Sequence, residues 1–242
     1  GIKAHGTFQS VDLPEGRVPI TCRWVYDIKR NKNGSIKTFK ARLVVQGFKQ
    51  REGIDFSKTF SSTTQLRTFR LAVAVGLELD LNMTQYDISN AFLNGKLEED
   101  IYMTWPPSYP SKEKGKVIKL IKGLYGLKQA SRLWQQTLYD TLTSPELGLK
   151  VCKTESGVLH TKTASGEVVL LLCFVDDLVL FCNDKELEKK IVRCLGSNFF
   201  LKCLGELEHY VGVVVEHDKE NGEIAMHQSP DNSKVWKSYL DE

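Results

Sequence analysis

The stretch EVVLLLCFVDDLVLF, residues 167–181, decides the fold. Two nearly unbroken apolar runs enclose the adjacent carboxylates Asp176 and Asp177. Runs that are apolar on both faces are typical of strands in the middle of a covered sheet. A buried carboxylate is costly unless it is paired, hydrogen-bonded or bound to a cation. We therefore predict a central hairpin that holds a cation site at its turn, although aspartates are also common in ordinary turns.

The rest of the chain alternates between strand-like and helix-like patterns, with no internal repeat and no clear linker. Residues 1–20 and 104–116 look like loops, and turns are expected at 31–34 and 221–222. Thr63 or Thr64 is the expected N-cap of the first helix and Asp184 that of the last. The predicted strands are 23–29, 36–48, 83–88, 157–162, 168–174, 178–182, 206–218 and 223–228, and the predicted helices are 65–79, 127–142 and 185–199. This order favours an α+β fold, an antiparallel sheet with helices on one face.

Composition indicates a folded protein that does not cross a membrane. The chain has 242 residues, of which 41% are hydrophobic and 26% charged, and no apolar run approaches the roughly 20 residues of a membrane span. Its six cysteines form no C-x-x-C pair, so we expect an intracellular protein with reduced thiols and no structural zinc. The first residue is glycine, which suggests a piece of a longer product.

The net charge of +3 hides a strong asymmetry along the chain. Counting Lys and Arg against Asp and Glu gives +7 for residues 1–60, +6 for 112–136 and −5 for 200–242. A single charged run is commonly a solvated face, but two basic segments with acids elsewhere favour a polyanionic partner.

A third carboxylate, Asp87, ends the short apolar strand in QYDISNAFLNG. If that strand lies beside the hairpin, three carboxylates converge and require positive charge between them. Oxygen ligands suit Mg²⁺ or Mn²⁺. Two such ions support phosphoryl transfer, with the basic segments holding the substrate's phosphates.

Five blocks, in one order, resemble the reverse transcriptase of Ty1/copia-type retrotransposons, the RNA-dependent DNA polymerase domain of a Gag-Pol polyprotein. They are FKARLVVQGFKQREGIDFSKTFS (39–61), QYDISNAFLNGKLEEDIYMTWP (85–106), LIKGLYGLKQASRLW (120–134), CFVDDLVLF (173–181) and LGELEHYVGVVVE (204–216). The resemblance implies one reverse transcriptase domain with a right-hand polymerase architecture. Fingers would occupy about 20–82 and 101–120, and palm about 83–100 and 121–230, with most of the thumb missing and a divergent or truncated tail at 231–242.

The same resemblance implies the site residues. Asp87, Asp176 and Asp177, with the carbonyl of Ile88, would hold two Mg²⁺ or Mn²⁺ ions and catalyse dNTP addition to a primer 3′-hydroxyl. The expected nucleotide-binding residues are Lys40, Arg42, Phe92, Gly126, Lys128 and Gln129. Phe92 would exclude the 2′-hydroxyl of a ribonucleotide, Lys40 and Arg42 would hold the triphosphate, and Gly126 would permit close approach near the templating base.

The implied partners are an RNA or DNA template with its primer, dNTPs and the protease, integrase and RNase H parts of the polyprotein, with no membrane. The implied location is a cytoplasmic virus-like particle, with the nucleus as an alternative. The chain departs from the family pattern at Phe174, where a tyrosine is usual, and at FSSTT (60–64). An inactive or domesticated remnant that binds nucleic acid without catalysis is therefore the alternative. Another two-metal enzyme, such as a nucleotidyl cyclase, is disfavoured by the LYGLKQ block.

Overall fold

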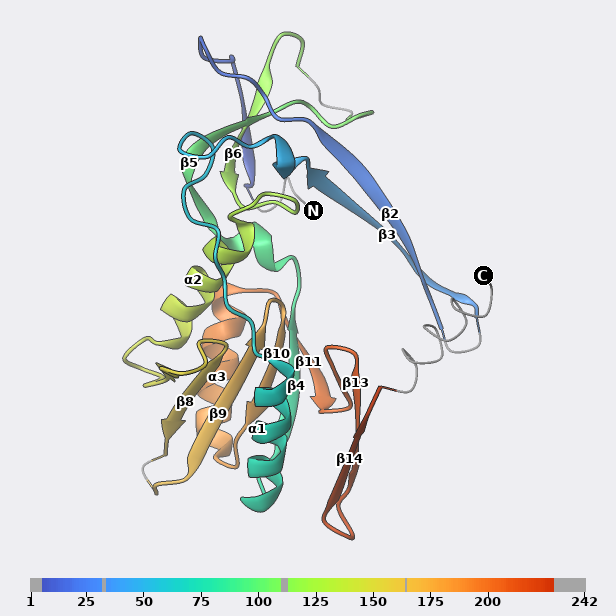
Figure 1. The fold of residues 1–242 in the computed structure, drawn as a ribbon, viewed down its shortest axis with the longest axis vertical. Helices are drawn as coiled ribbons and strands as arrows, with labels where there is room; N and C mark the ends of the chain where they lie inside the picture. Colours follow the sequence, from blue (N-terminus) through green and yellow to red (C-terminus); the bar gives the residue numbers. More distant parts are fainter. Residues whose placement is uncertain (1–5, 32–33, 110–112, 164, 229–242) are drawn as a thin grey trace. The chain divides into compact units, whose positions relative to one another are not determined.

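A computed structural model describes residues 6–31, 34–109, 113–163 and 165–228 (Figure 1). The chain divides into two compact units. Unit 1 comprises Gly1–Ser61 and Asn90–Leu138, and unit 2 comprises Ser62–Ser89 and Tyr139–Glu242. In the described part of the chain, no helix is long and apolar enough to cross a membrane.

Unit 2 is built on an antiparallel six-stranded sheet with the predicted hairpin inside it. In spatial order the strands are β11 (Leu201–Glu206), β4 (Met83–Ile88), β10 (Asp177–Phe181), β9 (Val168–Phe174), β8 (Val158–Lys162) and β7 (Lys150–Val151). The hairpin β9–β10 is therefore flanked by β4 and β8. Its apolar sequence follows from this place, because both of its edges are paired and both of its faces are covered.

Helices cover both faces of this sheet, so the expectation of helices on one face is wrong. α1 (Leu66–Glu78) packs Phe69 and Val73 into a buried cluster with Met83 of β4. α3 (Lys185–Asn198) meets the other face, where Glu188 accepts a hydrogen bond from the Tyr86 hydroxyl at 2.7 Å. Met83 and Tyr86 are three residues apart on β4 and therefore point to opposite faces. Figure 1 shows α1 in front of the strands and α3 behind them.

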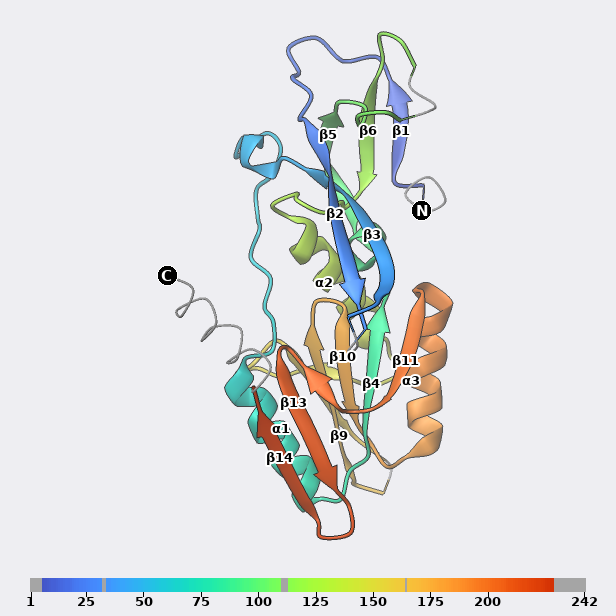
Figure 2. The same cartoon turned by 90° about the vertical axis from the view of Figure 1, so that its right-hand side faces the viewer.

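A second small sheet in unit 2 corrects the single strand expected at 206–218. It contains β12 (His209–Tyr210), β13 (Val213–Asp218) and β14 (Glu223–His227). Val211 and Gly212 both have positive φ angles, 48° and 79°, which reverse the chain between β12 and β13 as a two-residue hairpin turn does. β13 and β14 lie beside α1 (Figure 2).

Unit 1 contains a three-stranded sheet, a two-stranded ribbon and most of one helix. The sheet order is β1 (Phe8–Val11), β6 (Val117–Lys122) and β5 (Lys96–Met103), and the ribbon pairs β2 (Cys22–Arg30) with β3 (Ile36–Val45). Two 3₁₀ turns, η2 (Gly47–Lys49) and η3 (Ala91–Asn94), and α2 (Ala130–Leu142), which runs on into unit 2, complete the elements. Ile101, Ile118 and Leu120 lie in the core of this unit.

Most predicted elements are confirmed, including the Asp184 cap, which accepts hydrogen bonds from the amides of Glu186 and Leu187. Neither threonine caps α1. Its N-cap is Gln65, and the Thr64 hydroxyl bonds instead to the carbonyls of Gly157 and Cys173. Residues 1–20 are not all loop, because β1 forms there and pairs with β6.

Some expectations cannot be compared with the structure. The turn at 31–34, the loop at 104–116 and the tail at 231–242 fall partly or wholly outside the described residues. The boundaries between the two units differ from those expected between fingers and palm. The assignment of fingers and palm therefore stays a prediction.

Candidate active site

The candidate site lies on one row of directly opposed residues across four strands of unit 2. Asp87 of β4 is the cross-strand partner of Asp177 of β10. Asp177 is opposed on its other side by Phe174 of β9, and Asp87 by Lys202 of β11. Opposed residues in a sheet project from the same face with their Cβ atoms about 4.5–5.5 Å apart. The strand of Asp87 therefore lies beside the hairpin, as predicted, and two of the three carboxylates are neighbours.

Asp176 lies in the two-residue turn between β9 and β10. Its carbonyl accepts a hydrogen bond from the Ile88 amide at 2.9 Å, which ties the turn to the end of β4. Val175, the other turn residue, has a φ of 57°. A β-branched residue in the left-handed region is an outlier that costs about 1–3 kcal/mol. The surrounding sheet therefore holds this turn in a strained shape next to the carboxylates.

Apolar and aromatic groups surround this end of the sheet. The Phe174 ring meets Tyr210 edge-on, with centroids 6.4 Å apart. Burial raises the pKa of Tyr210 far above its usual value, and the nearby charge of Asp177 adds to the shift. Burial alone raises the pKa of the Cys173 thiol in the same way. Both groups therefore stay neutral at physiological pH.

Asp87, Asp176 and Asp177 suit a divalent metal in two respects: they are carboxylates, and the pairing of β4 with β10 brings Asp87 beside Asp177. All are oxygen donors of the kind that Mg²⁺ and Mn²⁺ prefer. Among the residues that the structure describes, however, no group of three or more His, Cys, Asp or Glu side chains is close enough to hold a metal as it stands. The residues that would hold such a metal are Asp87 and Asp177, which are opposed across two strands, and Asp176 in the adjoining turn.

Lys202 is a site residue that sequence reasoning missed. It is exposed on β11 and opposes Asp87 directly. A cation at this position offsets part of the repulsion between neighbouring carboxylates. The segment LKCLGE has neither the apolar run nor the regular alternation that signals a strand, so only the pairing with β4 reveals the role of Lys202.

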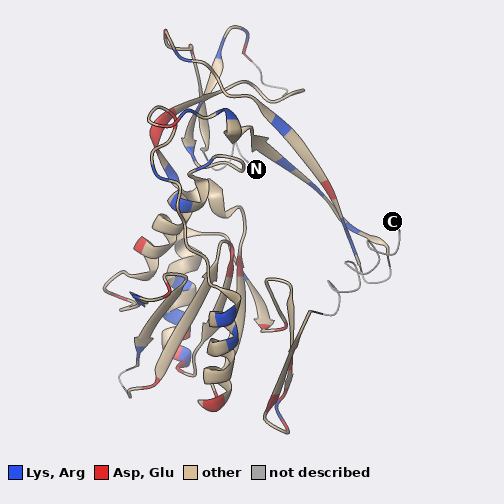
Figure 3. Cartoon of the chain, in the orientation of Figure 1, with Lys and Arg blue, Asp and Glu red and all other residues tan. Residues whose placement is uncertain are grey.

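Lys40 and Arg42 lie on the β2–β3 ribbon in unit 1. They are opposed by Asp27 and Val25 and, being two residues apart, project from the same face of the ribbon. Both are half-buried. Figure 3 shows Lys and Arg recurring along the ribbon and acidic residues at the adjacent ends of β4 and β10.

Phe92 and Gly126 also belong to unit 1. Phe92 lies on η3, half-buried between Ala91 and Leu93, which are fully buried. Gly126 has a φ of 90°, and a Cβ atom there would lie 2.1 Å from the Val45 carbonyl oxygen. The glycine is therefore required by a close contact with the end of β3, which is a structural reason independent of any nucleotide.

Gln129 and Lys128 differ sharply in exposure. Gln129 is fully buried and donates a hydrogen bond to the Asp55 carbonyl at 2.8 Å, while it accepts one from Gln50 at 2.9 Å. Lys128 is exposed, with its Nζ 4.4 Å from the Phe56 ring centroid. Direct contact of Gln129 with a template or nucleotide would require its buried network to open. Its side chain is thus placed to position the 47–56 segment, and the nucleotide contact stays a prediction.

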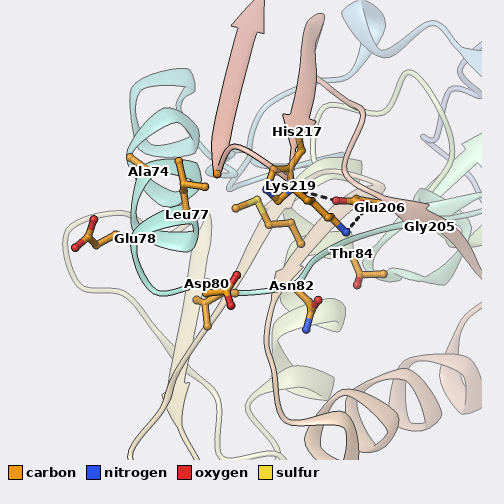
Figure 4. A pocket seen from close by; sticks show the side chains of 13 residues that line it. Ala74, Leu77, Glu78, Asp80, Asn82, Thr84, Gly205, Glu206, His217 and Lys219 are labelled. Carbon is orange, nitrogen blue, oxygen red and sulfur yellow. Dashed lines mark hydrogen bonds and ion pairs between the residues drawn. The ribbon is translucent and has the colours of Figure 1, made fainter.

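A cavity of about 710 Å³ lies at the opposite end of β4, lined there by Met83 and Thr84 (Figure 4). On its wall Glu206 pairs with Lys219 at 2.9 Å and with His217 at 3.1 Å. Lys219 lowers the pKa of Glu206 by hydrogen bonding, and His217 contributes in the same direction. None of the predicted site residues lines this cavity.

Comparison with known proteins gives the family. Residues 5–239 match the family model for reverse transcriptase (RNA-dependent DNA polymerase). The chain is 34% identical, over 98% of its length, to the retrovirus-related Pol polyprotein from transposon TNT 1-94 of Nicotiana tabacum, and 35% identical, over 86%, to that from transposon RE1 of Arabidopsis thaliana. It is 31% identical, over 77%, to the transposon Ty1-DR5 Gag-Pol polyprotein of Saccharomyces cerevisiae.

These matches cover only 18%, 14% and 10% of the lengths of the three polyproteins. The family model nonetheless matches nearly the whole of this chain, residues 5–239, and this range includes every residue of the row described above. The chain belongs to the reverse transcriptase (RNA-dependent DNA polymerase) family, with Ty1/copia-type Pol polyproteins of plant and yeast transposons as relatives.

Proposed function

We propose that this chain is the RNA-directed DNA polymerase domain of a Ty1/copia-type polyprotein and that it adds dNTPs to a primer 3′-hydroxyl. The observation that carries the proposal is the pairing of Asp87 with Asp177 beside the turn that holds Asp176. The pairing brings Asp87 to the same sheet end as Asp177 and the adjacent Asp176, which are distant from it in the sequence, and the chain belongs to a family of RNA-dependent DNA polymerases.

In the proposed reaction the 3′-hydroxyl attacks the α-phosphate of the dNTP, and pyrophosphate leaves. Two Mg²⁺ ions bound at the site would lower the pKa of the attacking hydroxyl and stabilise charge on the leaving group. Asp87, Asp176, Asp177 and the Ile88 carbonyl would hold these ions. The hydrogen bond from the Ile88 amide to the Asp176 carbonyl holds the backbone of Asp176 at the end of β4, which supports this assignment.

The substrates are proposed from charge and from the family. Lys40 and Arg42 on the ribbon would bind the triphosphate, and Phe92 would contact the sugar. An RNA or DNA template would be held mainly through its phosphates, so that binding weakens as salt rises. The protease, integrase and RNase H partners and the virus-like particle remain proposals as well.

Primer extension tests the proposal. The wild-type chain is incubated with an RNA template, a labelled DNA primer, dNTPs and Mg²⁺ or Mn²⁺, beside Asp176→Asn and the exposed unit 2 control Glu223→Gln. We expect extension by the wild type and the control and loss of extension by Asp176→Asn. Equal extension by Asp176→Asn would contradict the metal assignment.

The second candidate, a remnant that binds nucleic acid without catalysis, is favoured by one observation. Phe174 stands where a tyrosine is usual in the family that the chain resembles. The same experiment separates the two, because a remnant would retain the template-primer in a binding assay and never extend it with either metal.

A further inference from the structure

Phe92, the proposed sugar contact, packs against the core of unit 1 but is only partly buried there. It lies on the short turn η3, which begins after Asn90, a residue with a φ of 57°. The turn buries Ala91 and Leu93 and leaves the Phe92 ring half-exposed. A half-exposed aromatic ring can occupy more than one rotamer unless a neighbour blocks the alternatives.

Tyr125 is that neighbour. Its ring meets the Phe92 ring edge-on, with centroids 4.9 Å apart and an angle of 72° between the planes. Edge-to-face pairs at this distance are favourable beyond the area that they bury. The contact is formed within unit 1, so it does not depend on the placement of the two units.

The backbone of Tyr125 is held at both ends of its turn. Its carbonyl accepts the Val45 amide at 2.8 Å. At the other end, the Gly123 amide donates to the Gly95 carbonyl at 2.7 Å, and a Cβ atom on Gly123 would lie 2.6 Å from the Phe92 carbonyl oxygen. The turn is therefore packed directly against the backbone that carries Phe92, which keeps the backbone of Tyr125 beside the Phe92 ring.

We propose that Tyr125 is a specificity-determining residue, which holds the Phe92 ring in one orientation and so sets the discrimination between deoxyribonucleotides and ribonucleotides. The inference rests on the proposed function. A fixed ring collides with a 2′-hydroxyl, whereas a ring that can rotate yields to it. Tyr125 acts through Phe92 and is a positioning residue, because no contact between Tyr125 and the nucleotide is required.

Tyr125 has two roles, one of its ring and one of its backbone, and a substitution can separate them. The link from Tyr125 to Val45, and so to the strand that carries Lys40 and Arg42, is made by the backbone carbonyl. A side-chain substitution leaves that link in place and removes only the ring contact. A substitution at Tyr125 that changes only the preference for dNTP over rNTP therefore identifies the ring contact as the cause.

The test is single-nucleotide incorporation with dNTP and with the matching rNTP. The variants are Tyr125→Leu, Tyr125→Phe, Phe92→Ala and the double variant Tyr125→Leu/Phe92→Ala. Tyr125→Leu should lower the dNTP-over-rNTP ratio of kcat/KM by about two- to tenfold, as the strength of an aromatic pair implies. Tyr125→Phe keeps the ring and should keep the ratio. In the Phe92→Ala background, Tyr125→Leu should have no further effect.

Phe8→Leu is the matched control, since it removes another edge-to-face pair of unit 1, with Trp105 at 6.0 Å, and should leave the ratio unchanged. If Tyr125→Leu does not fold, as judged by circular dichroism, Tyr125→Met serves the same comparison.

Two results would overturn the inference and leave the proposed function standing. One is an unchanged dNTP-over-rNTP ratio in a folded, active Tyr125→Leu. The other is an equal effect of Tyr125→Leu on this ratio with and without the Phe92 ring. Absence of any extension by the wild type would instead overturn the proposed function and, with it, the inference.

Discussion

The hairpin β9–β10 and the ribbon β2–β3 are both antiparallel pairs of strands, yet they differ in almost every physical respect. In the hairpin, Leu172 and Leu178 are fully buried. In the ribbon, Tyr26 and Phe39 each keep 73% of their surface exposed. The hairpin is enclosed in a six-stranded sheet, whereas the ribbon strands pair only with each other among the described residues.

This difference teaches what each pair of strands can do. An enclosed hairpin can hold carboxylates at fixed positions, because neighbouring strands and helices resist any displacement. A two-stranded ribbon is marginal in isolation and stays accessible to solvent. Its cations, including the half-buried Lys40 and Arg42, can therefore meet a large, charged substrate. We propose that the catalytic carboxylates lie at the hairpin and that the phosphate-binding cations lie on the ribbon.

The largest expected effect comes from removing a carboxylate beside the hairpin. Asp87→Asn should lower the rate of primer extension by roughly 10²–10³-fold or more, as the loss of a preorganised charged group does. Its stability should be equal or higher, because Asp87 opposes Asp177 and like charges repel across strands. Asp27→Asn on the ribbon is the matched control and should change the rate only slightly. Similar losses from both substitutions would break the comparison.

The next effect concerns stability. Leu172→Ala in β9 should lower the free energy of unfolding by about 2–5 kcal/mol, because it opens a cavity in a closed core. Phe39→Ala on the ribbon removes a larger side chain but should cost no more than about 0.5 kcal/mol, since most of that ring is exposed. Chemical denaturation of both variants measures the two values. Equal losses of unfolding free energy in the two variants would mean that the Phe39 ring packs against another part of the protein.

Cations on the ribbon should affect substrate binding and leave stability unchanged. Arg42→Ala should raise the KM for dNTP by about tenfold or more, the loss expected for a hydrogen bond to a charged group, and leave the melting temperature as it is. Steady-state kinetics at two salt concentrations checks this result. Lys37→Ala, which removes an exposed cation on the other face of the ribbon, provides the comparison, and an equal rise in KM for both would indicate a general charge effect.

The smallest effect is expected at the strained turn of the hairpin. Val175→Gly should raise the free energy of unfolding by up to about 1 kcal/mol, because glycine adopts a positive φ without steric cost while losing more backbone entropy. Thermal unfolding measures the shift. A clear loss of stability would show that side-chain packing at Val175 outweighs the strain in its backbone.

The sequence predicts the hairpin well, because long apolar runs depend on burial, which residue types record directly. The pairing of the Asp87 strand with the hairpin was only a condition in the sequence reasoning, and the structure supplies it. The strand β11 carries no such signal, since LKCLGE is exposed along most of its length. Thr64 was mistaken for a cap because its hydroxyl bonds to strands that are distant in sequence.

The remaining differences also arise from contacts between distant segments. The burial of Gln129 depends on Gln50 and Asp55, far away in the chain, and its contact with a template or nucleotide stays a prediction. The sequence does not predict the chain reversal at Val211, because this residue lies in an apolar run that would ordinarily continue as one strand. Tyr125 gave no separate signal within its motif, because its partner Phe92 lies in another block.

Metal binding at the row of carboxylates tests the central claim most directly. Crystals of the chain with template-primer, a dNTP and Mn²⁺ allow each ion to be located by its anomalous scattering. We predict two Mn²⁺ ions about 4 Å apart, ligated by Asp87, Asp176 and Asp177. Ions bound elsewhere, or Asp87 turned away from its neighbours with both substrates in place, would contradict the account.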